Sequence, residues 1–412
     1  MKFSQLFTKT TKQIPKDEVS KNSELLIRAG YVDKLMSGVY TYLPLGLRVL
    51  NKIKNIIRLE IDVLGGQEIL MPALTPKENY EKTGRWDMDC LFKLKGVGDK
   101  EYALGATHEE IITPLIQKFA SSYKDFPMAV YQIQDKFRNE PRAKSGILRG
   151  REFSMKDLYN FDIDEKRFDE FYTRAQQAYA NIFTTVGLGD LTYLTYASGG
   201  AFSKYSHEYQ TVVEVGEDTI HLCEACGVAI NQEIIAEQKT CPVCGNDKLT
   251  IKNAVEVGNI FKLKTKFSGA FDFTAKDKDG DKQEVLMGCY GIGPSRVMGT
   301  VVEIYHDDRG IIWPEAIAPF KVHLLFIGKD NAEKETADKL YNDLQVNHIE
   351  VLYDDREEVG AGEKMADADL LGIPYRILIS TKSLAENSVE YKKRAKGEAE
   401  LVKIDKIIEK LK

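Results

Sequence analysis

The sequence predicts an α+β protein with a largely antiparallel sheet, followed by a separate α/β domain. Strand-like segments follow one another between residues 128 and 293, which is typical of an antiparallel sheet. Beyond Pro319 strands and helices alternate, which predicts the α/β domain. Two Cys-x-x-Cys pairs within residues 219–250 predict a small metal-bound insertion. A chain of 412 residues is too long for one ordinary core, so several domains are expected.

Composition and charge exclude several classes of protein. Hydrophobic residues make up 43% of the chain and charged residues 29%, so a disordered or fibrous protein is excluded. A net charge of −6 neither favours nor excludes nucleic-acid binding, because such binding needs only a local basic surface. Residues 1–18 lack the apolar run of a secretion signal, and no stretch approaches the ~18 apolar residues that span a bilayer. We therefore expect a soluble, cytoplasmic protein with no membrane partner.

The first clear element is an amphipathic helix over residues 45–64. Gly65 and Gly66 follow it, and glycine commonly ends a helix. The run from Glu68 to Pro72 predicts a strand that ends at the proline. Apolar residues recur at helical spacing along the helix, at Leu50, Ile53, Ile57, Ile61 and Leu64.

A predicted hairpin lies at the centre of the middle region. Residues 128–139 alternate well enough to predict a strand, and residues 151–159 resume an extended pattern after a loop rich in Arg, Lys and Gly. The other predicted elements of this region are helices over 109–119, 164–183 and 295–305 and strands over 255–263 and 284–293. The C-terminal domain is predicted to hold strands over 322–328, 349–353 and 375–380 and helices over 331–345 and 362–371.

The predicted hairpin concentrates residues suited to binding phosphate and a base. Arg138 ends the first strand, and Arg149 and Arg151 open the second, so all three are able to face one cleft. Arginine offers a planar fork of donors for phosphate oxygens. Glu140 is suited to accept from an exocyclic amine, and Phe153 offers a ring for stacking. A solvated, charged hairpin is the alternative interpretation.

A second candidate anion site follows the last strand of the middle region. Gly291 and Gly293 permit close approach of a ligand to the backbone, and Arg296 stands near a helix N-terminus. Most such glycine pairs are simple turns, so the pair alone is weak evidence. The pattern GxxxxGK[ST] is absent from the sequence, which argues against a P-loop protein.

Four of the six cysteines form a metal-binding pattern. Cys223 and Cys226 are separated from Cys241 and Cys244 by the 14 residues 227–240, which is close to zinc-ribbon spacing. Four thiolates suit a tetrahedral structural Zn²⁺, and a reduced set of free thiols is the alternative. The metal is expected to staple a short insertion that has too little core of its own.

Several long segments resemble one enzyme family. They are LIRAGYVDKLMSGVYTYLPLGLRVL, LGATHEEIITPL, YQIQDKFRNEPR, LRGREFSMKDLYNFD and MGCYGIGPSRV, and all are similar to bacterial-type prolyl-tRNA synthetases. The segments around Arg138 and Arg151 resemble motif 2 of class II aminoacyl-tRNA synthetases, GIGPSR resembles motif 3, and the helix and strand that end at Pro72 resemble motif 1. The later segment DDREEVGAGEKMADADLLGIP resembles the anticodon-binding domain of the same family.

The resemblance implies a domain organisation and an activity. It implies a class II catalytic domain over residues 1–318, a zinc-ribbon-like insertion over 219–250 within it, and an anticodon-binding domain over 319–412. The implied enzyme is a proline–tRNA ligase, which uses ATP and Mg²⁺ to convert L-proline to prolyl-adenylate and transfers proline to the 3′ end of tRNA(Pro). The resemblance also implies a homodimer formed through the helix and strand around Pro72.

The resemblance further implies roles for single residues in the catalytic domain. Thr107 and Glu109 would hold the proline amino group, and Cys289 would line the proline pocket. Arg138 would bridge the proline carboxylate and the α-phosphate. Arg138 and Arg296 are the implied catalytic residues. The residues implied to bind ATP are Arg138, Glu140, Arg149, Arg151, Phe153, Glu256, Gly291, Gly293 and Arg296.

Other polar residues are assigned to tRNA binding or to structure. Asp355, Arg356 and Lys364 match the anticodon-recognition segment of the family, and a solvated charged loop is the alternative. Attack of a carboxylate on a phosphate needs no protein nucleophile, because positioning and cations are sufficient. His108 and His207 are therefore interpreted as structural groups.

The chain departs from the family pattern in several places. Asn139 and the tripeptide 143–145 differ from the usual residues at loop positions, so contacts with the tRNA acceptor end are expected to differ while ATP binding is retained. Asn259 and the segment AFSKYSHEY after Gly200 also differ, and these departures concern the proline pocket. Only the 44 residues 211–254 lie between the flanking motifs, which is too few for the long hydrolytic editing insertion of many relatives. We expect measurable activation of alanine and no hydrolysis of alanyl-tRNA, because a missing methylene or two costs only ~1–3 kcal/mol each.

Two other functions compete with proline activation. A threonine or serine synthetase shares the class II core, although the long proline-type segments argue against it. A tRNA-binding relative that has lost activation is the second alternative, and Arg138, Glu140, Phe153 and Arg296 argue against it because such a protein is expected to lose them.

Overall fold

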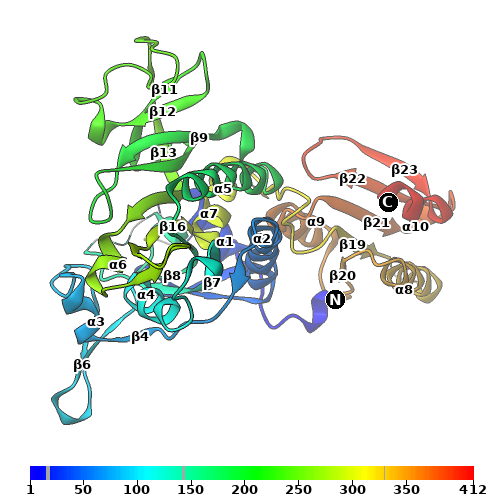
Figure 1. Cartoon of the computed structure of the whole chain (residues 1–412). Helices are drawn as coiled ribbons and strands as arrows, with labels where there is room; N and C mark the ends of the chain where they lie inside the picture. Colours follow the sequence, from blue (N-terminus) through cyan, green and yellow to red (C-terminus); the bar gives the residue numbers. More distant parts are fainter. Residues whose placement is uncertain (15–18, 142, 144, 329) are drawn as a thin grey trace. The chain divides into compact units, whose positions relative to one another are not determined.

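The computed structural model describes residues 1–14, 19–141, 143, 145–328 and 330–412 (Figure 1). Lys144, which belongs to one departure from the family pattern, lies outside the described residues. The chain forms two compact units. The larger unit contains residues 35–40 and 53–300, and the smaller unit contains residues 1–34, 41–52 and 301–412. The elements α2 (Pro44–Val63), α7 (Pro294–Ile304), β1 (Val32–Met36) and β2 (Val39–Tyr42) contribute residues to both units.

A nine-stranded sheet organises the larger unit. Its neighbouring strands are antiparallel, except for the parallel pairs β12–β9 and β3–β7. The antiparallel sheet predicted for the middle region is therefore confirmed. In order across the sheet the strands are β10 (Tyr205–Val212), β9 (Thr192–Ser198), β12 (Val228–Asn231), β11 (Asp218–Cys223), β13 (Thr250–Lys264), β16 (Leu286–Ile292), β8 (Glu152–Asp162), β7 (Met128–Phe137) and β3 (Gln67–Glu68).

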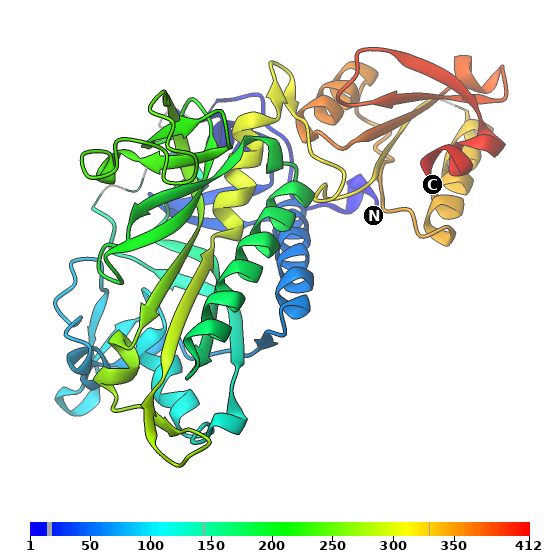
Figure 2. The same ribbon diagram turned by 45° about the horizontal axis from the view of Figure 1, so that its top comes forward.

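The long helix α5 (Glu165–Thr185) covers one face of this sheet (Figure 2). It packs on β8 and β16, where the Phe171 ring meets the Tyr290 ring edge-on at 5.6 Å. Asp164 caps the helix by accepting from the Arg167 backbone N–H. The buried positions recur at helical spacing, so the sequence prediction of this helix is confirmed; they are Phe168, Phe171, Tyr172, Ala175, Ala178, Tyr179, Ile182 and Phe183.

Shorter elements complete the larger unit beside the sheet. A three-stranded sheet has the order β4-β6-β5, and it leads into the helix that begins at Glu109. These elements are β4 (Leu74–Pro76), α3 (Lys77–Lys82), β5 (Lys93–Lys95), β6 (Glu101–Leu104), α4 (Glu109–Gln117), α6 (Lys266–Ala270), β14 (Thr274–Lys276) and β15 (Lys282–Glu284). Short 3-10 turns lie in the larger unit at Val97–Asp99, Tyr123–Asp125, Gly146–Leu148, Gly189–Leu191 and Gln232–Ile234, and in the smaller unit at Phe3–Gln5 and Ile404–Lys406.

The smaller unit is built on a five-stranded sheet of order β20-β19-β21-β22-β23. The first three strands are parallel, as the alternation of strand and helix predicts, and the last two are antiparallel. Its other elements are α1 (Lys21–Arg28), β17 (His306–Asp307), β18 (Gly310–Ile311), α8 (Asn331–Val346), α9 (Ala361–Leu371), α10 (Thr381–Leu384) and α11 (Ile407–Leu411). The strands are β19 (Val322–Ile327), β20 (Val351–Asp354), β21 (Tyr375–Ser380), β22 (Ser388–Lys393) and β23 (Ala399–Lys403).

The predicted strand over residues 68–72 is wrong in extent. Only Gln67 and Glu68 form a strand, β3, in parallel register with β7. At Met71 the backbone N–H instead donates to the side-chain oxygen of Gln132, and Pro72 has no N–H to donate. The hydrogen-bond ladder between β3 and β7 therefore ends before Pro72, because the Gln132 side chain takes the Met71 N–H that would otherwise bond to a backbone carbonyl.

Candidate functional site

A cavity of about 240 Å³ opens at the face of the large sheet, beside the start of α4. Strands β7, β8, β13 and β16 supply most of its walls. It brings together residues that are far apart in the chain. Nine of the residues implicated by the sequence line it: Thr107, Glu109, Arg138, Phe153, Glu256, Cys289, Gly291, Gly293 and Arg296.

One end of the cavity is acidic. Glu109 is the first residue of α4, and only 1% of it is exposed. Its Oε2 atom lies 3.3 Å from Nη1 of the buried Arg85, and its Oε1 atom accepts from the Cys289 thiol at 3.2 Å. Burial and the neighbouring carboxylate raise the pKa of Cys289 well above its ordinary value, so the thiol stays protonated and donates. Among the described residues, the buried Thr107 hydroxyl finds no hydrogen-bond partner.

This end of the cavity has fewer positive charges than carboxylates. The buried Glu110 shares Arg85 with Glu109, at 2.9 Å from the same Nη1 atom, and accepts from the Thr83 hydroxyl. Burial is the largest cause of the raised pKa of Glu110. A single guanidinium is therefore shared by two adjacent carboxyl groups, and their repulsion is relieved when one further cation binds or when Glu110 takes up a proton.

The other end of the cavity is basic. The Arg138 guanidinium lies 5.2 Å from the centre of the Phe153 ring, and its Nε atom donates to the Ala106 carbonyl at 3.4 Å. Arg296 donates to the carbonyls of Leu148 and Glu256 at 2.9 and 2.7 Å. Burial and the nearby Arg296 charge lower the pKa of Arg138, but a guanidinium remains protonated in proteins. Arg296 also lies 3.6 Å from Glu256 Oε2, which lines the same end of the cavity. Two guanidinium groups at this end and the Glu109 carboxylate at the other suit a ligand with separated charges.

A second cavity of about 200 Å³ shares Arg138, Glu256 and Arg296 with the first. Glu140 and Arg149 also line it, and Arg149 donates to Glu140 Oε2 at 2.9 and 3.1 Å. Burial is the largest cause of the raised pKa of Glu256. The two cavities together hold the residues expected to contact a nucleotide, with one exception.

That exception is Arg151, which lines neither cavity. Its guanidinium donates to the carbonyls of Glu140 and Ser37 at 3.0 and 2.9 Å. Arg151 therefore braces the loop that begins at Glu140, and its contact with phosphate stays a prediction.

A buried ion pair forms the floor of the first cavity. Lys136 on β7 and Asp157 on β8 lie 2.6 Å apart, and neither is exposed by more than a few per cent. Asp157 also accepts from Gln132 and Tyr159 at 3.0 Å each. Sequence reasoning missed this network and Arg85, because nothing in the local pattern separates these charged residues from solvated ones.

Of the two histidines assigned to structure, His108 is buried and His207 is half-buried, and both are neutral at pH 7. Burial lowers the pKa of both His108 and His207 to about 4. His108 Nε2 lies 3.1 Å from the Pro72 carbonyl oxygen, and His207 Nδ1 lies 2.8 Å from the Tyr172 hydroxyl.

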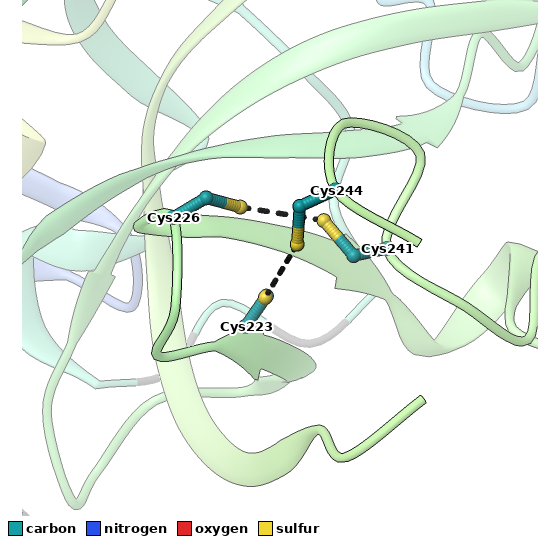
Figure 3. A group of neighbouring side chains, drawn as sticks. All are labelled: Cys223, Cys226, Cys241 and Cys244. Carbon is teal, nitrogen blue, oxygen red and sulfur yellow. Dashed lines mark hydrogen bonds between the residues drawn. The ribbon is translucent and has the colours of Figure 1, made fainter. Parts of the chain in front are cut away.

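The four predicted metal ligands converge in space (Figure 3). All four sulfur atoms lie within 4.8 Å of one another, with Cys223 and Cys244 3.6 Å apart and Cys226 and Cys241 3.4 Å apart. A tetrahedral Zn²⁺ with Zn–S distances of about 2.3 Å needs sulfur atoms roughly 3.8 Å apart. The quartet therefore fits a zinc ion.

The three residues matched to anticodon recognition lie in the smaller unit, beside the N-terminal residues. Arg356 pairs with Asp354 and Asp367 at 2.7 and 2.8 Å and lies 4.0 Å from the centre of the Phe3 ring. Asp355 accepts from the backbone and hydroxyl of Ser4. The N-terminus lies next to β20 in Figure 1. No pattern in the sequence predicts that its residues contact Asp355 and Arg356.

Lys364 completes this group. It is buried, and its ammonium donates to the Phe326 carbonyl at 2.8 Å. Burial lowers its pKa. All three residues therefore cluster near the carboxyl ends of β19 and β20, and their contacts with tRNA stay predictions.

Comparisons with known proteins agree with this fold and site. The family model described as tRNA synthetase class II core domain (G, H, P, S and T) matches residues 92–305, and the anticodon binding domain model matches residues 317–412. The chain is a class II aminoacyl-tRNA synthetase. The proline–tRNA ligases of Caldicellulosiruptor bescii and of a Sulfurihydrogenibium species are 33% and 35% identical to it, over 99% of this chain and 97% and 98% of their own lengths. The chain belongs to the proline–tRNA ligase family.

Solved structures support the same fold. The Giardia lamblia prolyl-tRNA synthetase in complex with prolyl-adenylate is 19% identical and superposes with a TM-score of 0.77, covering 93% of this chain and 73% of that one. The alignment with the C. bescii enzyme runs over 560 positions, against 412 residues here, so well over a hundred positions have no counterpart in this chain. Of the helices formed by the described residues, none has the length and apolar content needed to cross a bilayer.

The Lys136–Asp157 pair gives a test of the cavity floor. Replacing Lys136 by Met leaves the buried Asp157 carboxylate without its cation, so the free energy of unfolding should fall by about 3–5 kcal/mol in urea denaturation. The matched control is Lys93→Met, because the Lys93–Asp87 pair is exposed and should contribute less than about 1 kcal/mol. Equal effects of the two substitutions would show that the buried pair is not a structural support.

Proposed function

We propose that this chain activates L-proline with ATP and transfers it to tRNA(Pro). The observation that carries the proposal is the charge pattern of the first cavity. One end has a carboxylate, Glu109, that shares its counter-ion, and the other has Arg138 and Arg296. An amino acid presents an ammonium and a carboxylate at a fixed separation, and its adenylate adds a phosphate. The pattern therefore fits an amino acid that reacts at its carboxylate end.

The amino-acid end supplies three contacts. Glu109 accepts from the ring ammonium of proline, and the Thr107 hydroxyl adds a second acceptor. The Cys289 thiol contributes a small, neutral wall. Arg138 binds both the proline carboxylate and the α-phosphate, which brings nucleophile and phosphorus together. Its fixed charge stabilises the negative charge that develops during the attack.

The nucleotide end is built from motif 2 and motif 3 residues. The adenine ring stacks on Phe153, and Glu140 accepts from its exocyclic amine. Arg149, Arg151 and Arg296 bind the β- and γ-phosphates. Glu256 helps to hold ATP through Mg²⁺, a hard cation that prefers oxygen ligands. Gly291 and Gly293 leave room for the nucleotide beside the strand, and pyrophosphate leaves when the adenylate forms.

The cysteine quartet holds a structural Zn²⁺. Its four sulfur ligands leave no open coordination position, which is the pattern of structural rather than catalytic zinc sites. The ion links the hairpin of β11 and β12 to the turn that carries Cys241 and Cys244. Folding of residues 219–250 therefore depends on the metal.

Transfer to tRNA uses the smaller unit for recognition. Asp355, Arg356 and Lys364 lie at the carboxyl ends of parallel strands, where loops commonly bind ligands, and Lys364 supports this segment from within the fold. The enzyme acts in the cytoplasm, where tRNA charging supplies translation, and its 44-residue segment 211–254 leaves no room for an editing domain.

The chain functions as a homodimer through the region around Pro72. In the larger unit Leu59 and Val63 on α2 and Leu70 beside β3 are 67%, 82% and 76% exposed. Exposed apolar residues gathered on neighbouring segments are typical of a protein interface. A second copy of the chain is the proposed partner of this surface.

Amino-acid-dependent exchange of pyrophosphate into ATP tests the proposed activity. Purified protein with Mg²⁺ should catalyse exchange with proline and, more weakly, with alanine, because a proline pocket cannot strongly exclude a smaller amino acid. Threonine and serine are the comparison substrates. Exchange with threonine or serine alone would assign the chain to a sister synthetase, and no exchange from folded protein would overturn the activity altogether.

Metal analysis tests the cysteine site. The purified protein should contain one zinc per chain, and Cys244→Ser should lose the metal and become sensitive to proteolysis within residues 219–250. Cys90→Ser, which alters a cysteine outside the quartet, should retain both zinc and protease resistance. Metal-free protein that remains protease-resistant would contradict a structural zinc ion.

Substitution of Arg356 separates tRNA recognition from activation. Arg356→Ala should raise the KM for tRNA while leaving proline-dependent exchange unchanged, because the residue lies in the smaller unit. Lys406→Ala, on an exposed turn of the same unit, is the control. Equal loss of tRNA charging and exchange would count against the assignment.

A further inference from the structure

Phe202 stands between two cavities of the larger unit. It lines the first cavity together with Thr107 and Glu109, and it also lines a neighbouring cavity of about 470 Å³. Asn259 and Phe261 are the other residues common to both. The ring packs against the edge of the hydrophobic core and, with a cavity on either side, separates the two cavities.

Contacts with other side chains hold the Phe202 ring in place. The Arg85 guanidinium lies 4.8 Å from its centre, and the Phe261 ring lies 4.8 Å away at an interplanar angle of 39°. The turn that carries Phe202 is closed by its backbone N–H, which donates to the Gly199 carbonyl at 2.9 Å. Gly200 in the same turn has φ +53°, a conformation that suits glycine.

Arg85 connects the Phe202 ring to the acidic end of the first cavity. The same guanidinium that stacks on Phe202 pairs with Glu109 and Glu110, and it stacks on Phe267 at 5.3 Å as well. Only 6% of Arg85 is exposed, so the stack is shielded from water and stronger than at the surface. The Arg85 guanidinium therefore positions both the Glu109 carboxylate and the Phe202 ring.

We propose that Phe202 determines amino-acid specificity and that Arg85 is the residue that positions it; this inference rests on the proposed activation of proline. Phe202 limits the space beside the amino-acid end and prevents a longer side chain or larger ring from entering the neighbouring cavity. Arg85 holds both the Phe202 ring and the Glu109 carboxylate in place. The contact with the substrate ammonium and the limit on the size of the substrate ring therefore depend on the same residue.

Ring-size analogues of proline test the proposal in the exchange assay. The substrates are proline, its six-membered homologue pipecolate and its four-membered homologue azetidine-2-carboxylate. Wild-type protein should prefer proline to pipecolate, and Phe202→Ala should reduce that ratio of kcat/KM by about tenfold or more, since one methylene in a pocket changes discrimination roughly 10–200-fold. The KM for proline should rise more than kcat falls, because the wall contributes to binding.

Three further variants separate specificity from stability. Phe202→Tyr retains a ring and should keep the wild-type ratio of proline to pipecolate. Arg85→Lys retains the charge but loses the planar stack, so it should lower the ratio in the same direction as Phe202→Ala. Phe119→Ala, at a residue that is 72% exposed, is the control for loss of a phenyl ring.

The outcomes distinguish failure of this inference from failure of the proposed function. Wild-type protein without proline-dependent exchange would overturn the proposed function itself. Active wild-type protein, with an unchanged ratio in Phe202→Ala, would overturn the role of Phe202. A reduced ratio in Phe202→Ala together with an unchanged ratio in Arg85→Lys would overturn the role of Arg85.

Discussion

Two adjacent buried carboxylates with one guanidinium between them are the constraint on which the site depends. Burying a charge is costly unless it is paired, and Arg85 is placed to pair with Glu109 and Glu110 together. Glu109 also begins α4, where the positive end of the helix dipole favours a negative charge. These interactions hold the two carboxyl groups in place, and the remaining positive charge comes from a proton on Glu110 or from the ammonium of a bound amino acid.

The antiparallel sheet places the opposite charges at a fixed distance from this pair. Arg138 directly follows β7, and Phe153 lies near the start of β8, so the hairpin brings the cation and the ring together. The buried Lys136–Asp157 pair ties the same two strands beneath the cavity. Because these strands lie inside a wide sheet, the cations are held before substrate binds, and such preorganisation is the main source of electrostatic catalysis.

The local pattern of residues in the sequence is sufficient to predict most helices and strands of the fold. The period of apolar residues predicts α2 and α5, and strand–helix alternation predicts the parallel part of the smaller unit. The strand before Pro72 was predicted too long, because Gln132, which is remote in sequence, takes the backbone N–H of Met71. A side-chain partner of this kind leaves no periodic signal.

The site was predictable only where residues stand in family motifs. Of the nine predicted residues that line the first cavity, Arg138, Phe153, Gly291, Gly293 and Arg296 were found from their types and positions, and Thr107, Glu109, Glu256 and Cys289 only from the family resemblance. Arg85, Lys136 and Phe202 were not found, because each acquires its role from partners brought close by the fold. A buried arginine and a solvated one look the same in a sequence. The difference is the presence of two carboxylates that only the tertiary structure brings within reach.

Calorimetric binding of a matched pair of ligands tests the central claim most directly. Proline and tetrahydrofuran-2-carboxylate have nearly the same shape, but the second has a neutral ring oxygen in place of the ammonium. Wild-type protein should bind proline far more tightly than the analogue, and Glu109→Gln should lose most of that preference because the unmatched negative charge is gone. A Glu109→Gln protein that retains the full preference for proline would show that the charge of Glu109 does not select the substrate.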